Sequence, residues 1–76
     1  MSLAHGECKI CMRGSIDTRW VDYYGEVVRD ELKKGEEIQS TTITQDVPDL
    51  AAFIGIVNRL SDMGYPVISL EYRQKD

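Results

Sequence analysis

Apolar and polar residues alternate near the start of the chain, from Cys8 to Met12. Cys8, Ile10 and Met12 fall on one side of this segment, and the residues between them fall on the other. A period of two is typical of a strand with one buried face. The pattern therefore predicts a first strand, which we expect Gly14 to end.

A short helix is predicted next, around Thr18 to Tyr24. Ser15 or Asp17 can accept hydrogen bonds from the free backbone N–H groups at its start. Trp20 and Tyr24 are four residues apart, so they would share the inward face of the helix.

Residues 26–34 fit two structures. A single helix from Thr18 to Lys34 would place its apolar residues on one stripe, but Gly25 in its middle costs about 1 kcal/mol relative to Ala. The alternative is a hairpin, with strands at 26–32 and 37–45 joined by a turn at 33–36. We favour the hairpin, because the β-branched residues of the second segment prefer extended backbone and a strand needs a neighbour.

The clearest helical pattern follows this segment. Asp46 is placed to cap the helix, Asp49 lies three residues on as in a capping box, and Pro48 fits the first turn. The apolar residues recur at helical spacing and are expected to form one broad face: Leu50, Phe53, Ile54, Val57 and Leu60. Gly64 and Pro66 are expected to end the helix.

A final strand is predicted from Val67, with Ile68, Leu70 and Tyr72 on one face. The chain has 76 residues, which is enough for one domain. We place that domain at residues 7–73, after a disordered leader at 1–6 and before a frayed tail at 74–76. Domains of this size have a small core and commonly gain stability from a metal, a disulfide or a partner subunit.

The net charge of the chain is −4, which disfavours nucleic acid and anionic membranes, since both need a positive surface. No apolar run reaches the roughly 18 residues that span a bilayer, and the start of the chain does not resemble a signal peptide. We therefore expect a cytoplasmic protein, in which the two cysteines remain reduced.

Three sequence blocks resemble a family of short, uncharacterised prokaryotic proteins. The blocks are Gly14-Ser15-Ile16-Asp17 with Trp20, Asp49-Leu50-Ala51-Ala52-Phe53-Ile54-Gly55, and Asp62-Met63-Gly64-Tyr65-Pro66-Val67-Ile68-Ser69. The resemblance implies an α+β fold of ferredoxin-like βαββαβ order, with two helices over an antiparallel four-stranded sheet. Members often carry Gln at the position of Leu50 and His at that of Ile54, so any role of those polar side chains is absent here.

The element order is also similar to that of the small regulatory ligand-binding domains of the ACT type. The likeness rests on topology and on the Asp-x-Pro-Asp entry to the helix at 46–49. The chain lacks the glycine that those domains usually carry at the ligand turn, so the likeness is an analogy of fold.

His5, Cys8 and Cys11 are the only residues with the types and spacing of a zinc site. Zinc takes about four ligands, and the chain offers three. Strand alternation also points Cys8 and Cys11 to opposite faces. We therefore expect a core Cys8, a surface Cys11 and a mobile His5, with neither metal nor redox chemistry.

Two further groups are candidates for an interface or a ligand site. Trp20, Tyr23 and Tyr24 form an aromatic cluster that suits a core or a subunit contact, and alternatively a flat ligand. Gly55 interrupts the best helix, which predicts that something approaches it closely. Ala51, Ala52 and Gly55 form a strip of small residues, suited either to tight packing within the monomer or to a groove or dimer contact.

Three functional hypotheses follow. The first is a non-catalytic interaction or assembly module that binds a second copy of itself or another protein. The second is an ACT-like domain that binds a small molecule. The third is a zinc or redox protein that uses His5, Cys8 and Cys11. The sequence offers no catalytic constellation and no cofactor motif, so we expect no enzyme activity from this chain alone.

Overall fold

The structure is a computed structural model that describes residues 5–16 and 27–75. These residues form an α+β fold with one helix and an antiparallel four-stranded sheet; the α+β class and the sheet agree with the prediction. In chain order the elements are β1 (Gly6–Arg13), β2 (Val27–Lys34), β3 (Glu37–Val47), α1 (Leu50–Asp62) and β4 (Val67–Gln74).

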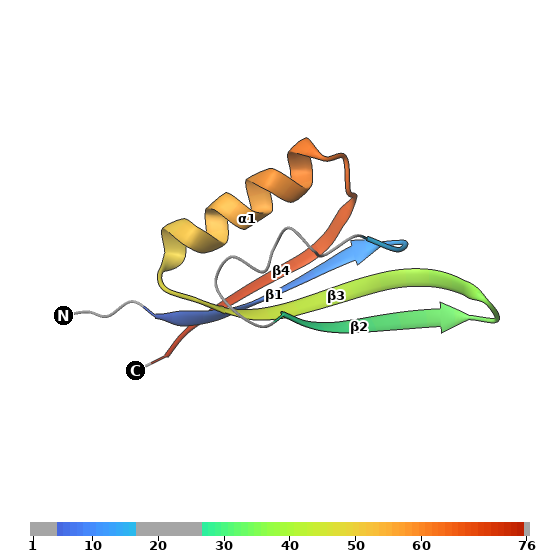
Figure 1. Cartoon of the computed structure of the whole chain (residues 1–76), viewed down its shortest axis with the longest axis horizontal. Helices are drawn as coiled ribbons and strands as arrows, with labels where there is room; N and C mark the ends of the chain where they lie inside the picture. The colour runs from blue at the N-terminus through green and yellow to red at the C-terminus, as the bar shows by residue number, and fades with distance from the viewer. Residues whose placement is uncertain (1–4, 17–26, 76) are drawn as a thin grey trace.

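The strands lie in the order β2-β3-β1-β4, so β1 and β3 are central and β2 and β4 are the edges. Every neighbouring pair is antiparallel. Helix α1 lies on one side of the sheet (Figure 1). The short helix expected at 18–24 falls outside the described residues, so the two-helix ferredoxin-like layout is not confirmed.

The core lies between α1 and the two central strands. Ile10 of β1 pairs with Ile43 of β3, and both are fully buried. Cys8 and Met12 are buried on the same face, as the period of two predicted. Gly14 then ends the strand with a positive φ of 81°, a backbone conformation that favours glycine.

The hairpin predicted for residues 26–45 is confirmed, and the single helix from Thr18 to Lys34 is wrong. Lys34 of β2 pairs with Glu37 of β3, and Gly35 between them has a φ of +66°. The β-branched residues of both segments therefore outweighed the helical spacing, because each strand obtains its hydrogen bonds from the other. Figure 1 shows the tip of this hairpin extending beyond the part of the sheet that α1 covers.

Helix α1 begins three residues later than a cap at Asp46 would place it. The cap is Asp49, whose Oδ1 accepts a hydrogen bond from the backbone N–H of Ala52 at 2.8 Å. Asp46 is instead part of β3, which runs on to Val47. The end of the helix agrees with prediction, because Gly64 follows it with a φ of +84°.

The broad apolar face predicted for α1 is only partly buried. Phe53 and Leu60 are in the core, together with Ala52 and Ile56. Leu50 and Ile54 are about half exposed. A single helix buries one stripe on the sheet, so apolar residues on its flank stay outside the contact.

The two ends of the described chain lie together. The backbone N–H of Lys75 donates a hydrogen bond to the carbonyl oxygen of His5 at 2.8 Å. Strand β1 thus starts at Gly6, inside the expected leader, and β4 continues to Gln74, inside the expected tail. Gly6 is also placed against β4, since a Cβ there would lie 2.6 Å from the Tyr72 ring.

Candidate functional site

The edge strand β4 carries apolar side chains that the monomer leaves exposed. Val67 is 37% exposed, Ile68 54% and Leu70 48%. Leu70 pairs with the fully buried Ile10 of β1, so it lies on the face that α1 covers. In the described part of the chain β4 pairs with β1 alone, and its outer edge has no neighbouring strand.

The flank of α1 continues this apolar surface. The ring of Phe53 lies 5.3 Å from that of Tyr72, so Phe53 marks the side of the helix nearest β4. At 100° per residue, Leu50 and Ile54 lie further round the helix on that same side. Each is 48% exposed. We call the exposed set Leu50, Ile54, Ile68 and Leu70 the edge patch.

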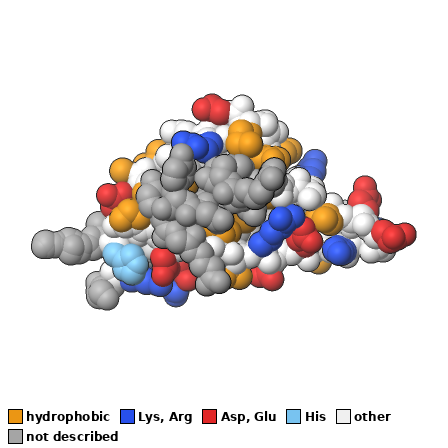
Figure 2. Space-filling model, in the orientation of Figure 1, with side chains coloured by type: hydrophobic (Ala, Val, Ile, Leu, Met, Phe, Trp, Pro, Cys, Tyr) orange, Lys and Arg blue, Asp and Glu red, His pale blue; other side chains and the backbone are white. Residues whose placement is uncertain are grey.

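The opposite edge of the sheet has a different character. Five of the eight residues of β2 are charged, from Arg29 to Lys34. The guanidinium of Arg29 lies 2.7 Å from the carboxylate of Glu31. Figure 2 shows acidic and basic side chains together at the hairpin end of the molecule. Charged side chains on an edge strand oppose pairing with another chain.

Over β1 and β4, the sheet face away from α1 is polar. Glu7 accepts a hydrogen bond from Arg73 of β4 at 3.0 Å, and Lys9 pairs in register with Glu71. These four residues line a shallow depression. Opposite charges on facing strands satisfy one another, as expected of a solvated sheet surface.

The predicted zinc ligands do not come together. Cys8 is buried beneath α1, whereas Cys11 lies on the opposite face of the sheet and is half-buried. Burial raises the pKa of the Cys8 thiol, which disfavours the reactive thiolate. Among residues 5–16 and 27–75, no three potential ligands are grouped to hold a metal.

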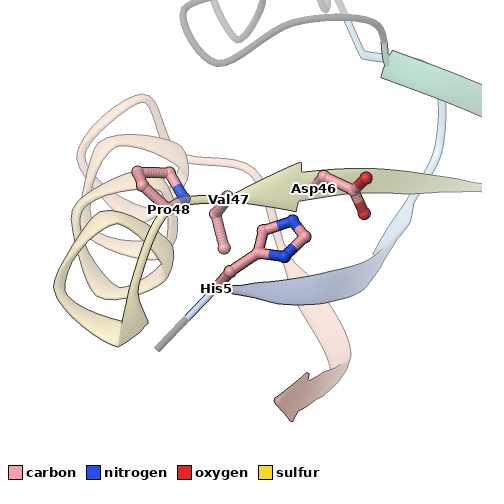
Figure 3. A pocket seen from close by; sticks show the side chains of 4 residues that line it. All are labelled: His5, Asp46, Val47 and Pro48. Carbon is pink, nitrogen blue, oxygen red and sulfur yellow. The ribbon is translucent and has the colours of Figure 1, made fainter. Parts of the chain in front are cut away.

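His5 lies instead at an open hollow with Asp46, Val47 and Pro48, where its ring lies near Asp46 (Figure 3). Asp46 accepts a hydrogen bond from the Nζ of Lys75 at 2.9 Å. That hydrogen bond, with the nearby positive charge, lowers the pKa of the Asp46 carboxyl. The Asp46 carboxylate is exposed and already paired with Lys75, so it is suited to holding the two ends of the chain together.

The other predicted interface residues separate into three groups. Trp20, Tyr23 and Tyr24 fall outside the described residues. Ala52 is in the core, and Ala51 is exposed. A Cβ at Gly55 would meet no described atom within 4 Å, so the expected close approach within the monomer is wrong. Its role in a groove or dimer contact stays a prediction.

Sequence reasoning missed the edge patch, because it assigned Leu50, Ile54 and Leu70 to a buried face. One signal was present: the last helix and strand together carry more apolar positions than one helix-to-sheet contact can cover. Which of them stay exposed depends on β4 being an edge strand, and this follows from the sheet order.

No helix in the described ranges is both long and apolar enough to cross a membrane. Neither the curated proteins nor the solved structures contain a match to this sequence. One family model matches, and it covers residues 7–71, from β1 into β4. On that match, the chain belongs to the family described as a domain of unknown function, DUF8691.

Proposed function

We propose that this domain is a non-catalytic protein-association module that acts as a homodimer. The observation that carries the proposal is the contrast between the two sheet edges: β4 is open and exposes three aliphatic side chains with only two charged residues, whereas β2 carries five charged residues around its exposed Val28 and Leu32. An unpaired apolar edge strand is a template for pairing with another chain, and proteins that remain monomeric commonly protect it.

The size of the exposed set supports this proposal. The edge patch contains four large aliphatic side chains, each about half exposed. Burying one such side chain fully contributes about 1.5–3 kcal/mol, so covering the remaining half of each is a sizeable gain for a small domain. Large exposed apolar patches mark interaction sites in soluble proteins.

Sedimentation velocity tests the proposal. The wild-type chain is expected to sediment as a dimer of the 8.7 kDa protomer at micromolar concentration. Leu70→Glu places a charge in the edge patch of both protomers and should raise the dissociation constant at least about 10-fold, since covering the exposed half of this leucine in both protomers contributes about 1.5–3 kcal/mol.

Leu32→Glu is the matched control, because Leu32 is an exposed leucine on the other edge strand, 65% exposed against 48% for Leu70. It should leave the dissociation constant unchanged. A wild-type chain that stays monomeric throughout the micromolar range would refute the proposed self-association.

Two finer elements belong to the same proposal. A helix at residues 18–24 would complete a ferredoxin-like layout, which the similarity of the sequence blocks at 14–20 and 49–69 supports. Its test is the backbone chemical shifts of those residues in solution. A cytoplasmic location agrees with the free thiols of Cys8 and Cys11.

A further inference from the structure

We propose that β4 pairs antiparallel with β4 of a second copy, with Leu70 facing the partner's Leu70. The two four-stranded sheets would then form one continuous sheet of eight strands, with both helices on the same side. This inference rests on the proposed function, because it specifies how the association module would bind its own copy.

Symmetry limits the ways in which the two strands can pair. A closed dimer has a two-fold axis, and in one shared sheet this axis stands perpendicular to the sheet between two antiparallel strands. Each residue at the axis then faces its own copy. Within β4 the central candidates are Ser69, Leu70, Glu71 and Tyr72.

A centre at Leu70 brings the apolar side chains together. Leu70 then faces the partner's Leu70, and Ile68 faces the partner's Tyr72 twice across the axis. Residues 67–73 all lie opposite the partner strand, and the irregularity of the β1–β4 register at Ile68 falls near one end of this segment. Facing apolar and aromatic side chains on paired strands stabilise a sheet.

A centre at Glu71 is less favourable, because it sets two carboxylates directly against each other. Like charges in facing positions destabilise a strand pair. With Leu70 at the centre, Glu71 faces the partner's Ser69 instead. The carboxylate of Glu71 lies beside Lys9, the residue that faces it on β1.

The two remaining centres pair a shorter part of β4, residues 67–71 or 70–74. A centre at Ser69 sets Ile68 against the partner's Leu70, but it also sets Val67 against the partner's Glu71 and then reaches Pro66, which has no N–H to donate. A centre at Tyr72 sets Ile68 against the partner's Asp76, beyond the end of β4, and sets Leu70 against the partner's Gln74. Both centres therefore form a shorter strand pair than the Leu70 register does.

Helix α1 fits the same arrangement. Leu50 and Ile54 project from the flank nearest β4, so each helix would extend the apolar contact above the new strand pair. The charged β2 edges would remain at the two ends of the long sheet. The assembly would therefore close at two copies.

A cysteine scan along β4 tests the register. Each of residues 69 to 72 is changed singly to cysteine in a Cys11→Ser background, where the remaining Cys8 is buried. A residue at the axis has its Cβ about 4.5–5.5 Å from its copy, close to the distance that a disulfide spans. Under mild oxidation, only Leu70→Cys should form a linked dimer in high yield.

Two controls accompany the scan. Cys11→Ser without an added cysteine should give no linked dimer, and Leu32→Cys on the charged edge should give only a background level. Each variant is first compared with wild type by urea unfolding, so that a misfolded chain is recognised. Because Leu70 is half exposed, its replacement should cost little monomer stability.

The outcomes separate the two proposals. Linking at position 70 alone supports the Leu70 register. A dimer in sedimentation that links best at 69, 71 or 72, or at none of the four, overturns this register and leaves the association module standing. A chain that neither sediments as a dimer nor links at any position overturns both.

Discussion

The two edge strands of this sheet, β2 and β4, have the same length but differ in how many charged residues they carry. Five of eight residues are charged in β2, against two in β4, Glu71 and Arg73. Both of those have partners within the sheet: Arg73 bonds Glu7, and Glu71 lies across from Lys9. Strand β4 therefore presents mainly apolar side chains at an open edge, whereas β2 surrounds its exposed Val28 and Leu32 with five charged residues.

This difference shows which edge is suited to a partner. A sheet of four strands has two open edges, and each can pair with another chain. Protecting one edge while leaving the other apolar permits one contact per molecule, and hence a closed assembly. If both edges were apolar, the same molecule could build open-ended chains of sheets.

The largest expected effect comes from removing this difference. Arg29→Val with Glu31→Val removes the two β2 charges that lie on the α1 side of the sheet, together with their ion pair of 2.7 Å. We expect species larger than a dimer in sedimentation velocity, growing with protein concentration. The charge-exchanged variant Arg29→Glu with Glu31→Arg keeps both charges and should sediment as wild type. Equal behaviour of the two variants would show that β2 charges do not protect the edge.

Gly6→Ala should disturb the packing of β4 on β1, and so lower the stability of the monomer. A Cβ at Gly6 would lie 2.6 Å from the Tyr72 ring, so the ring must leave its present position, 5.3 Å from the ring of Phe53. We expect the free energy of unfolding in urea to fall by about 1–3 kcal/mol, as for other overpacked sites.

A double-mutant cycle isolates that contact. In a Tyr72→Leu background the clash is removed, so Gly6→Ala should cost much less there than in wild type. An equal cost in both backgrounds would point to the backbone at Gly6 and not to the Tyr72 ring.

Gly55→Ala should act in the other direction. Gly55 lies within α1, and an added Cβ would meet no described atom within 4 Å. Replacing glycine by alanine inside a helix contributes about 0.5–1 kcal/mol, so unfolding should shift to higher urea concentration. A loss of dimer with no loss of stability would instead identify Gly55 as part of the subunit contact.

The smallest effect concerns the ion pair at the chain ends beside β4. The pKa of Asp46 is lowered by Lys75, so the stabilising contribution of the pair is present above the ordinary pKa of 3.8. It is lost as the pH falls through the lowered pKa. The melting temperature of Asp46→Asn should therefore lie slightly below wild type at pH 7 and match it in strong acid. A constant difference at both pH values would exclude this charge effect.

Much of the local structure followed from local pattern. Alternation in β1 placed Cys8, Ile10 and Met12 on one buried face, and the same alternation separated Cys8 from Cys11. The hairpin could be predicted because β-branched residues prefer extended backbone and Gly35 accepts a positive φ. These are properties of a few neighbouring residues.

The cap and the helix face were harder to predict, because each depends on distant residues. Asp46 and Asp49 are both good caps, and the choice between them depended on how far β3 stays paired with β1. Ala52 entered the core in place of Ile54, because the helix is rotated to pack Phe53 against Tyr72. The residues of the helix alone therefore determine neither its cap nor its buried face.

The sequence by itself determined an α+β domain of alternating strands and one strongly amphipathic helix. Only the tertiary structure decided that β1, with the same apolar alternation as β4, lies in the centre and buries its side chains, whereas β4 lies at the edge. The physical reason is that burial depends on neighbours from far along the chain. The edge patch, and with it the proposed function, therefore depends on the order of the strands in the sheet.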